Sequence, residues 1–359
     1  MANPNLKYAS LGLLVLQNSS LVLLMSYSRN QSGPMYLSST AVALNEVVKV
    51  LVCLLVIFMT TGGWKQLVRT LQIEIIQKPI EMAKLTVPSF LYMVQNNLLY
   101  EALSTLDPAT YSVCYQLKIM TTALFSVILL KKKMTSVQWI SLVMLTVGVA
   151  LAEFSTHSSA DPLKAEKEKI EKNLVGEGMG EENPFLTSKL TGFVCVLAAA
   201  CTSGFAGVYF EMILKGAKTS LWIRNIQMGL PSILFALVSV YTKDFAKVNG
   251  NGFFHGYNFV VWGVIALQAI GGLVVAVVVK YADNILKAFA SAVSIITSCI
   301  LSAFFFQFRP SMMFVMGSSL VTSSVFMYSN PKLNREKRRK QSPLPYNNKN
   351  KDDDAKQHA

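Results

Sequence analysis

The sequence has 359 residues, of which 52% are hydrophobic and only 15% are charged. Soluble domains carry about 25% charged residues, so this composition excludes an ordinary soluble enzyme and indicates a polytopic membrane protein. The net charge of +13 would also suit a nucleic-acid-binding protein, but the basic residues are concentrated in short loops and in the C-terminal tail, where membrane topology accounts for them.

Ten stretches are apolar enough and long enough to cross a bilayer, which takes about 20 residues in a helix. They lie near residues 8–27, 39–61, 84–104, 108–130, 137–154, 189–213, 220–241, 257–279, 282–306 and 311–328. The five cysteines all fall within these stretches and have no histidine at metal-ligand spacing, which is typical of small buried side chains. We therefore predict an all-α membrane protein with ten transmembrane helices.

A polar segment divides the chain into two units of similar size. Residues 155–188 are rich in Glu, Lys and Gly, and they separate a first five-helix unit, residues 1–154, from a second, residues 189–330. The remaining residues, 331–359, form a strongly charged tail. We expect the insert to be solvated and partly disordered, and the tail to be flexible.

The two units resemble each other along the chain. Residues 95–149 align with residues 271–325 without a gap, and the apolar stretches coincide helix for helix. Because five crossings is an odd number, the second unit must enter the membrane from the opposite side. The pattern predicts two inverted five-helix repeats, an architecture in which substrates bind between the repeats near the membrane midplane. Ten unrelated helices are the alternative.

The distribution of basic residues predicts the orientation, because lysine and arginine favour short cytosolic loops. A cytosolic N-terminus places the loop residues Lys131, Lys132 and Lys133, together with the basic tail, in the cytosol. Ten crossings then return the C-terminus to the cytosol and leave the insert on the opposite side.

The second and third predicted helices carry polar residues within apolar sequence. Glu46 and Lys49 are three residues apart and share a helical face. A self-neutralising ion pair and a pair that lines a cavity fit this spacing equally well. Tyr92, Gln95 and Asn96 form a single stripe, which offers hydrogen bonds and a stacking face to a ligand. Hydrogen bonding between helices is the simpler alternative, but three polar groups in five residues favour a binding site.

The fourth predicted helix contains the most informative residue of the chain. Lys118 lies about ten residues, or roughly 15 Å, from either end of its apolar stretch. A cation at that depth must face a partner or a wet cavity, and reaching water along the helix would require unusually long snorkelling. Tyr111 and Tyr115 lie on the same helical face. We predict an anion-binding pocket here.

The second half offers matching groups. Residues 280, 284, 287, 291 and 294 form one polar stripe, which contains Lys287. Lys118 and Lys287, one from each half, could hold the two phosphates of a diphosphate. Asn225 is a candidate contact to a base, and Gly271 and Gly272 would allow a ligand or a helix to approach the backbone closely.

Catalytic signatures are sparse. The three histidines lie in predicted loops or the tail, and no glycine-rich phosphate loop is present. We predict no catalytic residue, no metal site and no cofactor.

Several sequence motifs occur in order and resemble those of the nucleotide-sugar transporters. They are Tyr-Leu-Ser-Ser-Thr-Ala-Val (36–42), Val-Gln-Asn-Asn-Leu-Leu-Tyr (94–100), Tyr-Gln-Leu-Lys-Ile (115–119), Gly-Phe-Ala-Gly-Val-Tyr-Phe-Glu (204–211) and Lys-Tyr-Ala-Asp-Asn-Ile-Leu-Lys (280–287). The chain is most similar to the subfamily for UDP-N-acetylglucosamine, UDP-galactose and CMP-sialic acid, within the drug/metabolite transporter superfamily.

This resemblance implies a Golgi membrane protein that exchanges a cytosolic nucleotide sugar for a lumenal nucleoside monophosphate. It also implies that Lys118 and Lys287 contact phosphate, and that Tyr92, Asn96, Tyr111 and Asn225 surround the nucleoside. Glu46 and Lys49 match the polar pair of the family. Two departures, Ser112 for a usual Gln and Ala288 for a usual Gly, border the expected pocket and bear on the choice of sugar.

The resulting prediction is a UDP-sugar antiporter for UDP-N-acetylglucosamine, UDP-galactose or both, with UMP as the exchanged nucleotide. Its expected partners are the two nucleotides and the lipid bilayer. Oligomers with itself, with related transporters or with glycosyltransferases are left open. The alternatives are a CMP-sialic acid transporter of the same family and a membrane-embedded glycosyltransferase.

Overall fold

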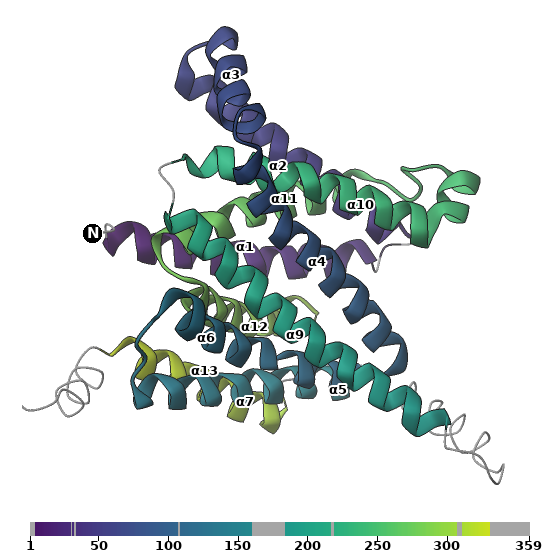
Figure 1. The fold of residues 1–359 in the computed structure, drawn as a ribbon. Helices are drawn as coiled ribbons and strands as arrows, with labels where there is room; N and C mark the ends of the chain where they lie inside the picture. Colours follow the sequence, from purple (N-terminus) through teal and green to yellow (C-terminus); the bar gives the residue numbers. More distant parts are fainter. Residues whose placement is uncertain are drawn as a thin grey trace, which may run out of the picture.

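The computed structural model describes residues 4–29, 31, 34–106, 108–159, 184–216, 219–306 and 311–330, and within these ranges every regular element is a helix. The first half contains α1 (Pro4–Arg29), α2 (Ser38–Thr61), α3 (Trp64–Leu71), the π-helical turn η1 (Gln72–Ile76), α4 (Pro79–Thr105), α5 (Pro108–Tyr115), α6 (Leu117–Leu130) and α7 (Ser136–Ser159). The second half contains α9 (Pro184–Gly216), α10 (Leu221–Asn251), α11 (Phe259–Tyr281), α12 (Asn284–Phe306) and α13 (Met312–Ser329) (Figure 1).

The packing of the helices follows a two-fold pattern. Each of three contacts in one part of the bundle has a counterpart in another. α4 packs on α9 as α11 packs on α1, and α6 packs on α9 as α12 packs on α1. Likewise, α4 packs on α10 as α11 packs on α2. The remaining major contacts, α2 with α10 and α7 with α13, join equivalent helices of the two halves. This pattern is the one expected of two repeats related by a two-fold axis.

The multi-pass, all-α prediction is confirmed, although the count of ten spans is not. Nine stretches of the described chain are long and apolar enough to cross a membrane, with α5 and α6 together counted as one. The other predicted span coincides with α4, whose polar residues lower its hydropathy. The N-terminus and the C-terminal end of α13 lie at the same end of the bundle (Figure 1).

Several element boundaries differ from the prediction. α4 begins at Pro79, five residues early, because proline fits the first turn of a helix. Two helices extend into the predicted insert: α7 ends at Ser159, and α9 begins at Pro184. The short helix α3 was not predicted. Residues 160–183 of the insert and the tail, 331–359, lie outside the described residues.

The predicted continuous helix over 108–130 is wrong, because it is interrupted at Gln116. The N–H group of Gln116 bonds to the Val113 carbonyl at 3.2 Å, and the N–H group of Ile119 bonds to the Gln116 carbonyl at 3.0 Å. These three-residue bonds replace the four-residue ladder of an α-helix. A second helix, α6, therefore begins directly before Lys118. The periodicity of apolar residues continues across the break, so the sequence pattern did not indicate it.

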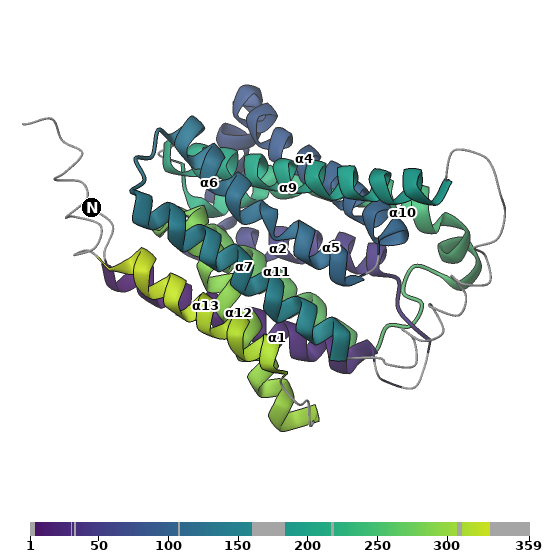
Figure 2. The same cartoon turned by 90° about the horizontal axis from the view of Figure 1, so that it is seen from below.

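The crossing of α7 and α13 is formed by two glycines. A β-carbon on Gly317 would lie 2.6 Å from the carbonyl oxygen of Gly148, and one on Gly148 would lie 2.9 Å from the carbonyl oxygen of Gly317. Small residues allow this approach of backbones, which is a common mode of helix association in membranes. Figure 2 shows the two helices side by side along one face of the bundle.

An ion-pair network closes the bundle at the end where α6 and α11 finish. Lys132 Nζ lies 2.6 Å from Asp283 Oδ2, which joins the two halves of the chain. Asp283 Oδ1 accepts a hydrogen bond from the Leu286 N–H group at 2.7 Å and so caps α12. Burial alone would raise the pKa of the Asp283 carboxyl, but the charge and hydrogen bond of Lys132 and the Leu286 N–H group hold this pKa below its ordinary value.

Glu211 of α9 extends the same network. Its carboxylate accepts hydrogen bonds from the Asn284 N–H group at 2.8 Å and from Lys215 Nζ at 2.6 Å. Lys215 Nζ also donates to the Ala282 carbonyl at 2.7 Å. The end of α9 is thereby fixed to the turn between α11 and α12.

A Gly317→Ala variant tests the α7–α13 contact. We expect a loss of about 1–3 kcal/mol in the free energy of unfolding, because the new methyl group meets backbone that cannot rotate away. The measurement is Tm in detergent. Gly12→Ala is the matched control, because a β-carbon at Gly12 meets nothing within 4 Å. An equal Tm for the two variants would contradict the close approach.

Two substitutions at Asp283 separate its two roles. Asp283→Asn keeps a capping oxygen but loses the ion pair, whereas Asp283→Ala loses both and should lower the free energy of unfolding by about 1 kcal/mol more. A double-mutant cycle of Asp283→Asn with Lys132→Met measures their coupling. Because the pKa of Asp283 is lowered, the coupling should be present at neutral pH and disappear only as the pH falls through that lowered pKa. A coupling of zero at neutral pH would show that the pair contributes no stability.

Candidate functional site

A cavity of about 300 Å³ lies inside the helix bundle and is lined by both halves of the chain. It is bounded by α1, α4, α6, α7, α9, α11 and α12. Its walls carry polar side chains at an unusual density for a membrane interior, together with several apolar ones. The lining residues are Asn18, Tyr92, Gln116, Lys118, Ile119, Thr122, Val149, Glu153, Ser203, Val275, Asn284, Lys287, Ala288, Ser291, Ala292 and Ile295.

Lys118 of α6 and Lys287 of α12 both line this cavity, one from each half. Within the described ranges, neither ammonium group has a carboxylate oxygen within the 4.0 Å limit for an ion pair. Lys118 Nζ instead lies 4.0 Å from the centre of the Tyr115 ring, and Tyr111 stacks on Tyr115 with ring centres 6.1 Å apart. A cation over an aromatic face is stabilised without being neutralised. Both positive charges are therefore available to an anionic ligand.

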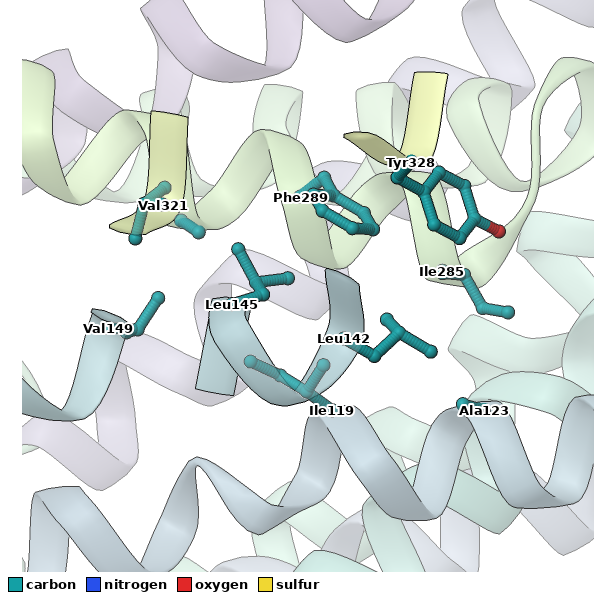
Figure 3. Close-up of a cluster of buried hydrophobic side chains, with 10 residues drawn as sticks. Ile119, Ala123, Leu142, Leu145, Val149, Ile285, Phe289, Val321 and Tyr328 are labelled. Atoms are coloured by element: carbon teal, nitrogen blue, oxygen red, sulfur yellow. The ribbon is translucent and has the colours of Figure 1, made fainter. Parts of the chain in front are cut away.

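Apolar packing fixes the positions of the two lysines. The cluster contains Ile119 beside Lys118 and Ile285 and Phe289 on either side of Lys287, and it joins α6, α7, α12 and α13. Figure 3 shows these side chains converging with Leu142 and Val321. Because the interior of such a cluster is closely packed, it forms a rigid wall of the cavity beneath the two charges.

Tyr92, which was predicted to contact a ligand, lines the cavity, whereas Gln95 and Asn96 of the same stripe do not. Gln95 is buried and donates a hydrogen bond to the Tyr115 hydroxyl at 2.8 Å, so it supports the aromatic pair next to Lys118. Asn96 is exposed. Asn225 is buried, and its amide donates to the Leu221 carbonyl of its own helix at 2.9 Å. The structure thus brings Tyr92, Lys118 and Lys287 together, and it places Gln95 behind them.

Glu46 and Lys49 form the ion pair that their spacing allowed. Lys49 Nζ lies 2.7 Å from Glu46 Oε1, and both side chains are mostly buried. Neither residue is part of the cavity wall. The two predicted glycines accommodate side chains of other helices. A β-carbon on Gly272 would meet the Lys49 chain at 2.7 Å, and one on Gly271 would meet the Gln17 amide of α1.

The structure adds residues that the sequence did not single out as a site. Glu153 lies at the end of the predicted helix 137–154 and was not singled out, yet α7 carries it into the cavity, where its Oε2 accepts a hydrogen bond from Gln116 Nε2 at 2.8 Å. Its place directly after the apolar stretch of α7 was the available signal. For Asn18 of α1, the available signal was the run of four polar residues, Gln17 to Ser20, in the middle of an apolar stretch.

Asn284 is the second addition, although it belongs to the polar stripe of α12. Its side chain lines the cavity and is almost fully buried, and its Oδ1 atom has no hydrogen-bond partner. A buried acceptor without a partner is unfavourable. The Asn284 side chain thus has an unused acceptor next to the cavity.

Two other observations define the limits of the site. No group of three or more His, Cys, Asp or Glu residues suited to a metal ion occurs in the described chain. A larger, open hollow of about 500 Å³ lies between α12 and α13, but its lining residues, from Ile296 to Ser323, include no charged group. The charged chemistry belongs to the cavity between the halves.

Comparison with known proteins gives a consistent result. The sequence pattern of a family described as "Nucleotide-sugar transporter" matches residues 2–329. The UDP-N-acetylglucosamine transporter of Homo sapiens is 50% identical over 328 residues, which cover 90% of this chain and 95% of that protein. The UDP-galactose translocator of Mus musculus is 43% identical over 332 residues, which cover 92% and 80%.

One solved crystal structure shares the fold. It superposes with a TM-score of 0.61 at 14% sequence identity and covers 90% of this chain and 98% of the other. The family match extends over nearly all of the described helices, including every residue that lines the cavity. The chain therefore belongs to the nucleotide-sugar transporter family.

Proposed function

We propose that this protein exchanges a UDP-sugar for UMP by alternating access, with the cavity between the halves as its substrate site. The observation that carries the proposal is the pair Lys118 and Lys287, which come from opposite halves and line one buried cavity without a carboxylate at ion-pair distance in the described chain. The relatives named above transport UDP-N-acetylglucosamine and UDP-galactose, so these are the proposed cargoes.

The chemistry of the cavity suits a nucleotide sugar. A UDP-sugar and UMP each carry two negative charges, and two ammonium groups can contact them in a site of low dielectric constant. The Tyr92 ring offers a stacking face to the base. Asn18, Ser203, Asn284 and Ser291 supply donors and acceptors for the ribose and sugar hydroxyls. The volume of about 300 Å³ lies at the small end of ligand sites, so a complete nucleotide sugar requires the cavity to widen.

Obligatory exchange follows from the same charges. An empty cavity leaves a net positive charge buried, because Glu153 supplies one negative charge against the two of Lys118 and Lys287, and this is unfavourable within a membrane. Interconversion of the two access states is therefore slow without a nucleotide and fast with one.

The proposal also includes the orientation of the protein in the membrane and the compartment into which the UDP-sugar is released. Basic residues concentrate at the end that bears Lys131–Lys133 and the tail, so we place this end and both termini in the cytosol. The Lys132–Asp283 network closes that end. The structure would then be open toward the lumen of the Golgi, where the released UDP-sugar serves glycosyltransferases.

Exchange is tested in proteoliposomes that contain purified protein. Vesicles preloaded with UMP should take up labelled UDP-N-acetylglucosamine or UDP-galactose at least tenfold faster than empty vesicles, because the loaded carrier returns with its charges compensated. Equal uptake would refute obligatory exchange. A panel of competing nucleotide sugars that includes CMP-sialic acid identifies the cargo, and release of free sugar instead of transport would indicate a transferase.

The role of Lys118 is tested by binding. Lys118→Ala should weaken the binding of UMP and UDP-sugar by at least a hundredfold, because each loses a charge-assisted contact at low dielectric constant. Nucleotide-dependent increase of Tm is the measurement. Lys65→Ala is the control, since Lys65 is an exposed lysine of α3 outside the cavity. If Lys118→Ala retained normal affinity for UMP, Lys118 would not contact phosphate.

A further inference from the structure

Among the described residues that line the cavity, Glu153 is the single acidic one. Its carboxylate is held by the side chain of Gln116, whose Nε2 donates to Oε2 at 2.8 Å. Gln116 is itself buried, at 4% exposure, and it occupies the interruption between α5 and α6. The negative charge therefore has a fixed position in the wall and faces the same space as Lys118 and Lys287.

The three charges of the wall do not cancel. Lys118 and Lys287 contribute two positive charges and Glu153 one negative charge. Neither lysine lies within ion-pair distance of Glu153, so the carboxylate remains available to act on a ligand. A site intended only for anions would omit this carboxylate, because it weakens the attraction for phosphate.

We propose that Glu153 is a charge filter, which admits nucleotide sugars with an uncharged sugar and rejects those whose sugar carries a carboxylate. This inference rests on the proposed function, and it narrows the substrate class. The phosphates engage the two lysines, and the sugar hydroxyls can donate hydrogen bonds to the Glu153 carboxylate. A uronic acid places a third negative charge in the same space.

The size of the cavity makes this repulsion substantial. Glu153 lines a space with the volume of a sphere about 8 Å across, so a sugar carboxylate that enters this part of the site lies about that far from Glu153. Two like charges at about 8 Å, in a medium of effective dielectric constant near 20, disfavour binding by more than tenfold. The effect depends on the charge of the sugar and should not depend on the configuration of its hydroxyls.

The test uses substrate pairs that differ only at the sixth carbon, where an alcohol is replaced by a carboxylate. UDP-galactose is compared with UDP-galacturonic acid, and UDP-glucose with UDP-glucuronic acid, as inhibitors of labelled UMP exchange in proteoliposomes. The wild-type protein should prefer the neutral member by more than tenfold. Glu153→Gln keeps the hydrogen bond to Gln116 possible but removes the charge, and it should reduce this preference at least tenfold.

Two further variants make the result specific. Glu153→Asp retains the charge and should retain the preference, even if exchange is slower. Glu101→Gln also removes one negative charge, but from an exposed position near the end of α4, and it should leave the preference unchanged. The proportion of each variant that is folded is measured by size-exclusion chromatography and Tm, so that inhibition constants refer to folded protein.

The outcomes separate the two proposals. If neutral UDP-sugars compete but Glu153→Gln leaves the preference unchanged, or lowers the affinity for both members equally, the charge filter is refuted and the transport function stands. A wild-type protein that accepts uronic acids as readily as neutral sugars also refutes the filter. If no UDP-sugar competes with UMP in the wild-type protein, the proposed function fails, and this inference fails with it.

Discussion

The structure depends on the burial of two like charges in an apolar helix bundle. Lys118 and Lys287 line one cavity, and no carboxylate of the described chain lies within ion-pair distance of either. Such an arrangement is tolerable only where the surroundings compensate. The Tyr115 ring, the fixed Glu153 carboxylate and the unpaired Asn284 oxygen supply part of that compensation. The cluster of apolar side chains from α6, α7, α12 and α13 packs against the helices that carry the two lysines.

The two halves of the chain pack their helices in the same arrangement, but they contribute different polar groups to the cavity. Each half contributes one lysine, and the packing partners of each helix recur in the other half. The carboxylate that moderates the charge comes from the first half, on α7, whereas the unpaired amide comes from the second half, on α12. An asymmetric ligand, with a base at one end and a sugar at the other, calls for this kind of departure from symmetry.

The sequence predicted the parts of the fold that depend on long apolar stretches, and it predicted the lysines because a buried cation is conspicuous within them. It did not predict the interruption at Gln116, because the apolar pattern continues across it, nor the hydrogen bond that Gln116 makes there to Glu153 on another helix. Glu153 itself was not singled out, since it stands beside the polar insert and the sequence alone does not show that α7 carries its side chain into the cavity. Glu46 and Lys49 had two equally good interpretations, and only the three-dimensional arrangement distinguishes the ion pair from a cavity wall.

The contact between Gly148 and Gly317 has a further consequence for motion. At this crossing the backbones of α7 and α13 come into direct contact at the two glycines, and Leu151 and Leu320 lie beside that contact. Helices that interlock through large side chains must change rotamers before they can turn against each other. At the glycines themselves the contact is between backbone atoms, so this point can act as an axis while the side chains on either side of it repack. The crossing joins equivalent helices of the two halves, so it can serve as the pivot around which the remaining helices exchange one opening of the cavity for the other.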